Sequence, residues 1–219
     1  SKEQWEGNRM GPSNCRKIGA KFGFPIEAFS EEISNFLINK ERIYFQKNLN
    51  KLLEDEVNKN ITSLKKTTSR TNHFIPEEVH SIDLLLHEIR LIKTKEEIKT
   101  IKEACEISSA AHIRAMKNVC PKMYEYQLEA EYVHEFMKKG ARNCAYPSIV
   151  GGGKNACILH YSDNKDLLMD GDLVLVDAGC EFNGYASDIT RTFPVNGKFS
   201  RAQQAVYEIV LDANVECIK

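Results

Sequence analysis

Residues 173–195 read LVLVDAGCEFNGYASDITRTFPV, and this stretch decides the fold. Two runs rich in apolar and β-branched residues flank the dipeptide Asn183-Gly184, which favours a two-residue hairpin turn. Such a turn pairs Phe182 with Tyr185 and thereby sets the register of every residue on both strands. The stretch therefore predicts an antiparallel hairpin with a defined register.

Two carboxylates on this hairpin are predicted to project from one face. The register places Asp177 opposite Thr190 and Gly179 opposite Asp188, and side chains alternate between the two faces of a strand. Asp177 and Asp188 are then diagonal neighbours, with Cα atoms about 7 to 8 Å apart. Asp177 also follows an apolar run that indicates burial, and two buried carboxylates repel unless they are protonated, paired or bound to a cation. Spacing alone leaves open that Asp188 pairs with Arg191 or another base and that Asp177 caps a turn.

The sequence before the hairpin predicts two helices. Thr94 and Glu97 form a capping box at the head of a helix that is expected to run to about Asn118. A second helix is expected over residues 124–139, with Gly140 as its C-cap.

Between these helices and the hairpin, the sequence predicts two further strands. YPSIV (146–150) and CILHY (157–161) have strand composition, and the glycines of 151–153 are interpreted as a structural turn between them. The fold class is therefore α+β with an antiparallel sheet.

The region upstream has a different character. It predicts a short helix over 29–37, a strand over 41–46 and a helix over 49–64, followed by a linker-like polar segment, 65–79. We therefore expect a separate domain over residues 1–85 and a second one over residues 86–219.

A last helix is expected after the hairpin. Ser200 and Gln203 form a capping box, and apolar residues follow on one helical face up to the final residue, Lys219. Because a domain seldom leaves such a face without a covering partner, we expect the chain to be part of a longer protein.

Composition excludes some classes of partner. The 219 residues are 42% hydrophobic, which is enough for a substantial core, and 30 basic against 31 acidic residues leave a net charge of -1. We expect neither nucleic acid nor a membrane as partner, since no apolar run approaches the roughly 20 residues that span a bilayer. The seven cysteines are odd in number and lack a CxxC pair, which favours a reducing compartment.

Three motifs together are similar to a known signature. VDAG (176–179), SDITRTFPV (187–195) and LHYSDN (159–164) resemble the pattern of the methionine aminopeptidase, creatinase and aminopeptidase P superfamily. The resemblance runs from about Ile89 to the end of the chain and is strongest over residues 146–199. It implies that residues 86–219 form the first half of a pita-bread catalytic domain, preceded by the end of a smaller α/β creatinase-type domain.

The resemblance also implies roles for five residues. Asp177 and Asp188 would be the first two ligands of a site for two divalent metal ions, with manganese expected and zinc or cobalt as alternatives. His160 would be catalytic, donating a hydrogen bond to the substrate where charge develops. Tyr161 and Asn164 would shape the substrate pocket. A later histidine and two glutamates complete the site in the family, and they are absent from this chain.

The implied activity is that of a metallo-aminopeptidase that removes one N-terminal residue from peptides or proteins. Within the family, the chain resembles the eukaryotic mitochondrial aminopeptidase P-like enzymes, such as the intermediate cleaving peptidase, which trim proteins after presequence cleavage. This resemblance favours the mitochondrion, with the cytoplasm as the alternative. Xaa-Pro aminopeptidase activity, a metal-free binding module and an inactive fragment remain open. The expected partners are peptide or protein N-termini, with a homodimer or association with the remainder of the enzyme as further possibilities.

Overall fold

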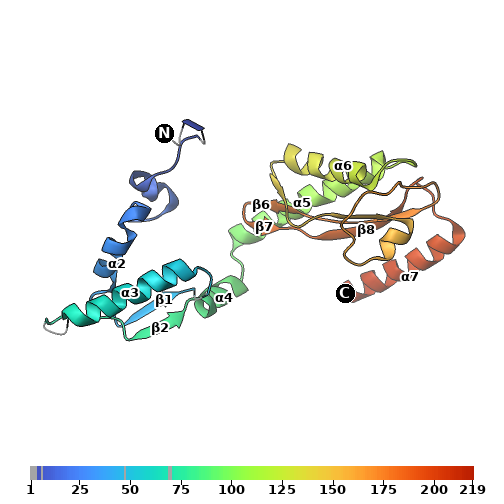
Figure 1. Ribbon diagram of the computed structural model, residues 1–219. Helices are drawn as coiled ribbons and strands as arrows, with labels where there is room; N and C mark the ends of the chain where they lie inside the picture. Colours follow the sequence, from blue (N-terminus) through green and yellow to red (C-terminus); the bar gives the residue numbers. More distant parts are fainter. Residues whose placement is uncertain (1–3, 6, 47, 69–70) are drawn as a thin grey trace. The chain divides into compact units, whose positions relative to one another are not determined.

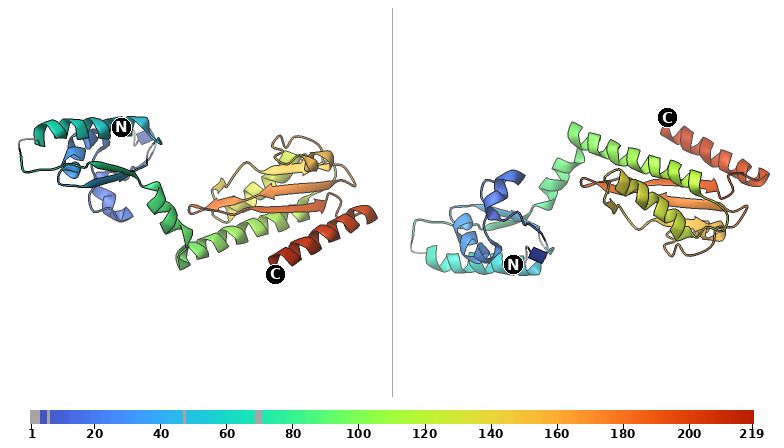
Figure 2. Two further views of the ribbon diagram at one scale, coloured as in Figure 1. Left: turned by 90° about the horizontal axis from the view of Figure 1, so that it is seen from below. Right: turned by 90° about the horizontal axis from the view of Figure 1, so that it is seen from above.

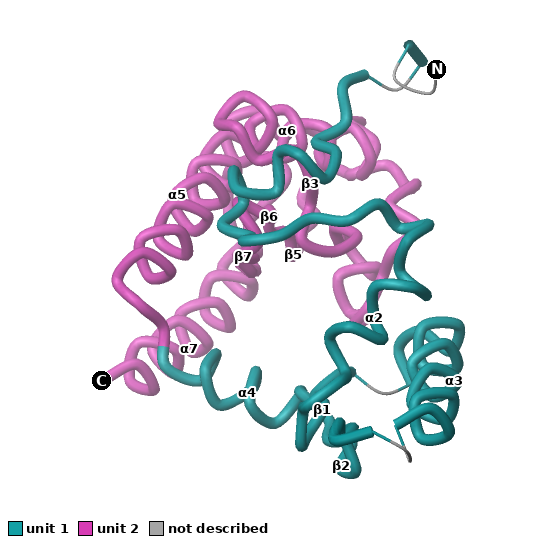
Figure 3. Tube along the Cα trace, turned by 90° about the vertical axis from the view of Figure 1, so that its left-hand side faces the viewer, with its two compact units in different colours: residues 1–92 teal, residues 93–219 magenta. Residues whose placement is uncertain are grey.

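The computed structural model describes residues 4–5, 7–46, 48–68 and 71–219 (Figure 1). The chain divides into two compact units, Ser1–Ile92 and Lys93–Lys219, which Figure 3 shows in different colours. The sequence placed the boundary between residues 85 and 86, which lies inside helix α4 (Asp83–Leu91). The assignment of the two units to particular domain types stays a prediction at this point.

The first unit combines helices with a two-stranded sheet. In chain order its elements are η1 (Pro12–Ile18), η2 (Ile26–Ala28), α2 (Phe29–Leu37), β1 (Arg42–Phe45), α3 (Lys51–Thr68), β2 (Glu78–Ser81) and α4 (Asp83–Leu91). The strands β1 and β2 pair in parallel. The expectation of a linker over residues 65–79 is wrong at both ends, because α3 continues to Thr68 with polar residues on its exposed side and β2 begins at Glu78.

The second unit consists of three long helices and two small sheets (Figure 2). Its elements are α5 (Lys95–Asn118), α6 (Glu125–Lys138), β3 (Asn143–Cys144), β4 (Ile149–Gly152), η3 (Gly153–Cys157), β5 (Leu173–Ala178), β6 (Cys180–Phe182), β7 (Tyr185–Ala186), β8 (Ile189–Pro194) and α7 (Arg201–Ile218). The strands are ordered β4-β5-β8 and β3-β6-β7, and all of these pairs are antiparallel. Among the described residues, no helix is both long and apolar enough to cross a bilayer.

The predicted helix starts of α5 and α7 are confirmed. The Thr94 hydroxyl accepts from the Glu97 backbone N–H at 3.2 Å, and the Glu97 carboxylate accepts from the Thr94 N–H at 2.6 Å. Ser200 and Gln203 make the equivalent pair of bonds at the head of α7. These reciprocal bonds satisfy backbone donors that the first helical turn leaves free.

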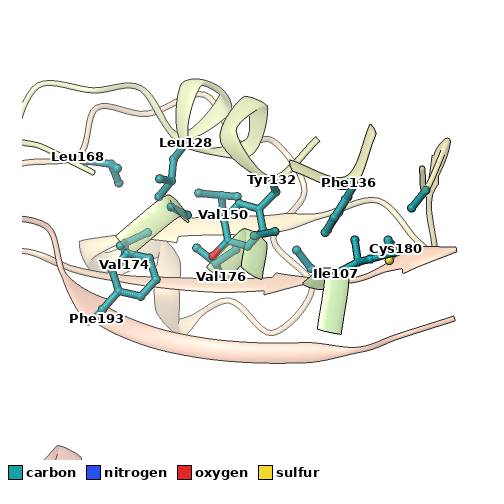
Figure 4. Packing of buried hydrophobic residues seen from close by; sticks show 14 of the residues in the cluster. Ile107, Leu128, Tyr132, Phe136, Val150, Leu168, Val174, Val176, Cys180 and Phe193 are labelled. Carbon is teal, nitrogen blue, oxygen red and sulfur yellow. The ribbon is translucent and has the colours of Figure 1, made fainter. Parts of the chain in front are cut away.

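The core of the second unit lies between helices α5 and α6 and one face of the strands (Figure 4). On β5 the residues Val174, Val176 and Ala178 are buried, together with residues of α5 and α6 such as Ile107 and Leu128. Since side chains alternate along a strand, the residues between them project from the opposite face. Asp177 therefore points away from the helices that cover the core.

The predicted register of the hairpin is confirmed, but the hairpin does not continue as one ladder. Phe182 pairs with Tyr185, and Asp177 with Thr190. The ladder is interrupted at Gly179, where a Cβ atom would lie 1.8 Å from the Ser187 carbonyl oxygen. This approach requires glycine and divides the pairing into β5–β8 and β6–β7.

Two expectations before the hairpin are wrong. Gly151 and Gly152 belong to β4 rather than to a turn, because their neighbours pack where Cβ atoms would lie, and only Gly153 has a positive φ of 53°. Residues 157–161 do not form a strand, since η3 ends at Cys157 and the following residues turn back, with the Tyr161 N–H donating to the Ile158 carbonyl at 3.3 Å.

The close approach at Gly179 gives a stability prediction. Gly179→Ala is expected to lower the free energy of unfolding by about 3 kcal/mol, because the added methyl meets backbone that cannot shift cheaply. Gly184→Ala is the matched comparison, since it has open space but a φ of 85°, and should cost about 1 to 2 kcal/mol. Urea unfolding followed by circular dichroism measures both. An equal or smaller cost for Gly179→Ala would contradict the interpretation of the backbone approach.

Candidate active site

Asp177 and Asp188 converge on one tyrosine hydroxyl. The Tyr146 hydroxyl lies 2.5 Å from Oδ1 of Asp177 and 3.1 Å from Oδ1 of Asp188, so its single proton is shared between two acceptors. Both carboxylates therefore face the same point on the open side of β5, as the register predicts. Their role as metal ligands stays a prediction that this geometry supports.

The two carboxylates differ in burial and in backbone support. Asp177 is half-buried, and its residue is paired with Ile149 of β4 on one side and Thr190 of β8 on the other. Asp188 is exposed and lies between β7 and β8, where the ladder is interrupted. The expected burial of both carboxylates is thus wrong for Asp188, because the strand pairing opens at this position.

Tyr146 keeps its proton. Burial, followed by the hydrogen bond to Asp177, raises the pKa of the Tyr146 hydroxyl above its usual value near 10. A phenol with a raised pKa remains a hydrogen-bond donor at neutral pH. It therefore offsets part of the repulsion between the two carboxylates.

A pair of buried serines holds the backbone before Asp188. The Ser187 hydroxyl lies 2.7 Å from the Ser108 hydroxyl of α5, and it accepts from the Cys180 N–H at 3.0 Å. Cys180 itself is fully buried. Ser187 thus ties the connection between β7 and β8, which carries Asp188, to helix α5.

A buried histidine holds the backbone after Asp188. His112 Nε2 lies 2.9 Å from the Ile189 carbonyl, and the Tyr132 hydroxyl lies 2.9 Å from Nδ1. A carbonyl only accepts, so Nε2 carries the proton and Nδ1 accepts from Tyr132. Burial lowers the pKa of His112 below its ordinary value of 6.5. The neutral ring therefore bridges α5, α6 and β8, as expected of a core histidine rather than a ligand.

His160 is exposed and lies in the irregular segment that follows η3. The next residue, Tyr161, is buried, and its hydroxyl donates to Oε2 of Glu125 at 2.7 Å. Asn164 is buried with a φ of 46°; its Oδ1 accepts from the Val150 N–H at 3.0 Å. The side-chain polar groups of Tyr161 and Asn164 thus bond to the protein itself, and their contact with substrate stays a prediction.

The described residues fit part of a metal site. Two carboxylates that converge on one point supply the hard oxygen ligands that divalent cations such as manganese and magnesium prefer. Within the described parts of the chain, no group of three or more His, Cys, Asp or Glu side chains gathers where a metal ion could bind. Asp177 and Asp188 would therefore provide two ligands of a site that needs others, and this role stays a prediction.

Tyr146 and Glu125 were not identified from the sequence. Tyr146 precedes a strand as an ordinary aromatic residue, and no local pattern indicates that its hydroxyl reaches two aspartates. Glu125 stands at the start of a helix, where an acidic residue is usual on a solvent-exposed turn. Only the tertiary contacts distinguish either residue from its neighbours.

The open face of the sheet thus presents two converging carboxylates, a pair of hard oxygen donors suited to divalent cations. The chain belongs to metallopeptidase family M24, whose family model matches residues 99–219. Its α+β architecture is that of the aminopeptidase P structures, which have the pita-bread fold.

Three similar proteins illustrate the relationship. The Xaa-Pro aminopeptidase of Escherichia coli is 42% identical over 96% of this chain and 48% of the relative, and mitochondrial intermediate cleaving peptidase 55 of Arabidopsis thaliana is 34% identical over 98% of this chain and 42% of the relative. The solved structure of proline aminopeptidase P II from Yersinia pestis matches with a TM-score of 0.90 and 46% identity over 97% of this chain and 49% of that chain. The chain spans about half the length of the curated relatives it matches.

The buried His112 gives a pH prediction. Because its pKa is lowered in the folded state, the unfolded chain binds a proton that the folded chain does not, and stability is lost as pH falls below about 6.5. His112→Gln keeps a donor for Ile189 and an acceptor for Tyr132 but cannot titrate. The difference in unfolding free energy between the two proteins should be constant above about pH 7.5 and should then change in favour of the variant, by at most about 1.4 kcal/mol per pH unit.

Urea titrations from pH 8 to pH 5 measure this difference. Parallel curves for the two proteins over the whole range would show that His112 is not the group that titrates.

Proposed function

We propose that the protein is a metallo-aminopeptidase that removes a single N-terminal residue from peptides or proteins. The observation that carries the proposal is the convergence of Asp177 and Asp188 on one point of the open sheet face, in a chain that belongs to family M24. A binding module has no physical need for two carboxylates that face each other across one hydroxyl. The metal-free alternative is therefore disfavoured.

The residues of this chain would act in three ways. Asp177 and Asp188 would hold two divalent ions, for which we propose manganese, with zinc or cobalt as alternatives. When bound, such ions supply a hydroxide nucleophile and polarise the scissile carbonyl. His160 would donate a hydrogen bond to the substrate as negative charge develops. Tyr146 would keep its proton and donate it in hydrogen bonds to the two carboxylates.

Two substrate classes are candidates. The first is the N-terminus of a protein trimmed after presequence cleavage in mitochondria, which the similarity to intermediate cleaving peptidase 55 supports. The second is a peptide with proline at its second position. The similarity to two Xaa-Pro aminopeptidases, which are 42% and 39% identical to this chain, supports this class. A homodimer, or association with a further part of the enzyme, stays a prediction.

Metal binding tests the role of the two aspartates. Calorimetric titration of the full-length protein with manganese should show two bound ions. Asp177→Asn and Asp188→Asn should each weaken binding by at least about 100-fold, since loss of a direct ligand exceeds the effect of losing a supporting residue. Asp170→Asn is the matched control, because Asp170 is an exposed carboxylate that accepts from Asn196 Nδ2 at 2.9 Å. Unchanged binding in both aspartate variants would refute the assigned ligands.

Peptide hydrolysis tests the activity and the substrate class. The full-length enzyme should release one N-terminal residue, and paired substrates with proline or alanine at the second position decide between the two classes. His160→Ala should lower kcat by about 100- to 1,000-fold, because it removes a donor to the developing charge. A variant with wild-type kcat would remove His160 from the mechanism, and a full-length protein with two bound ions and no hydrolysis of either substrate would overturn the proposed function.

A further inference from the structure

Glu125 is a fully buried carboxylate whose hydrogen bonds all come from neutral donors. Oε1 accepts from the Gly152 N–H at 2.8 Å and from Asn155 Nδ2 at 3.1 Å. Oε2 accepts from the Tyr161 hydroxyl at 2.7 Å and from the Asp166 N–H at 2.9 Å. A carboxylate offers about four acceptor positions, so these bonds use its full capacity.

The environment of Glu125 stabilises a carboxylate that only accepts. It stands at the first position of α6, where the backbone N–H groups of the helix N-terminus favour negative charge. Burial and the bond to Glu125 raise the pKa of Tyr161 to about 12, so the phenol stays protonated and donates. A buried acceptor that loses its donor is costly, so the Glu125 carboxylate favours the conformation in which all four donors reach it.

The four donors are distributed along one segment of the chain. They come from positions 152, 155, 161 and 166, and no helix or strand is present from residue 158 to residue 166. Glu125 therefore holds the part of this segment around Tyr161 without regular backbone pairing, while Asn164 anchors the segment separately to Val150 and Ser148. His160 lies within it, next to the bonded Tyr161, and its own side chain is exposed.

We propose that Glu125 is the positioning residue for His160 and acts through the hydroxyl of Tyr161. This inference rests on the proposed function, in which His160 contacts the substrate. It assigns Tyr161 a different role from the substrate pocket that the resemblance implies, because the Tyr161 hydroxyl already bonds Glu125. A displacement of a reacting group by about 1 Å can reduce a rate by about 100-fold, so a segment without regular structure needs such a fixed point.

Kinetics of the full-length enzyme distinguish positioning from substrate binding. Tyr161→Phe deletes one hydrogen bond without changing volume and should lower kcat by about tenfold while KM stays within about twofold. Glu125→Gln should lower kcat further, since its amide presents donors to the Asp166 N–H. Glu131→Gln is the matched control on the same helix, because Glu131 bonds Arg114 and Asn118 of α5 and none of the segment. It should leave both constants unchanged.

A double-variant cycle tests whether the effect passes through His160. In the His160→Ala background, Tyr161→Phe should have no further effect on kcat, because the positioned group is gone. Full additivity of the two effects would overturn the proposal, as would a raised KM with unchanged kcat in Tyr161→Phe.

A readout without turnover separates this proposal from the proposed function. In NMR spectra of histidine-labelled full-length protein, the His160 ring signal should shift or broaden in Tyr161→Phe and Glu125→Gln and remain unchanged in Glu131→Gln. An unchanged His160 signal in all three variants would overturn the positioning role even if the enzyme cleaves peptides. A changed signal in an enzyme without peptidase activity would retain the positioning role and reject the proposed reaction.

Discussion

The site depends on the register with which residues 173–182 pair with residues 185–194 about the Asn183-Gly184 turn. Because side chains alternate along a strand, a shift of one residue would move Asp177 to the face that α5 and α6 cover and would expose its apolar neighbours. The turn and the burial of that apolar face favour the same register, and the backbone approach at Gly179 prevents any side chain at that position. The convergence of Asp177 and Asp188 follows from this pairing, before any ligand is considered.

A second constraint is electrostatic and acts on the irregular part of the chain. The segment after η3 forms no strand, and Asn164 links it to the sheet by accepting from the Val150 N–H of β4. Glu125 also orders it, as a buried carboxylate at a helix N-terminus that accepts from four donors. The two constraints position different parts of the same candidate site, one through backbone pairing and the other through hydrogen bonds of side chains.

Features that depend on neighbours in sequence could be predicted, and features that depend on distant partners could not. The capping boxes at Thr94 and Ser200 and the hairpin register involve contacts within a few residues, and all agree with the structure. Residues 157–161 were expected to form a strand, since their composition is that of a strand, yet they form a turn whose Tyr161 side chain bonds Glu125, 36 residues apart. The hydroxyl of Tyr146 likewise reaches Asp177 over 31 residues.

The unequal support of the two aspartates has a consequence for tolerance to ionic radius. Asp177 is paired on both sides within a three-stranded ladder, so its carboxylate has a nearly fixed origin. Asp188 lies between β7 and β8, outside the ladder. Its neighbours Ser187 and Ile189 are bonded to Ser108 and His112 of α5. In a metal site built on this pair, the Asp177 carboxylate would keep its position and the Asp188 carboxylate could adjust. Cations of different size could then be accommodated by movement of Asp188 alone, without any change in the sheet.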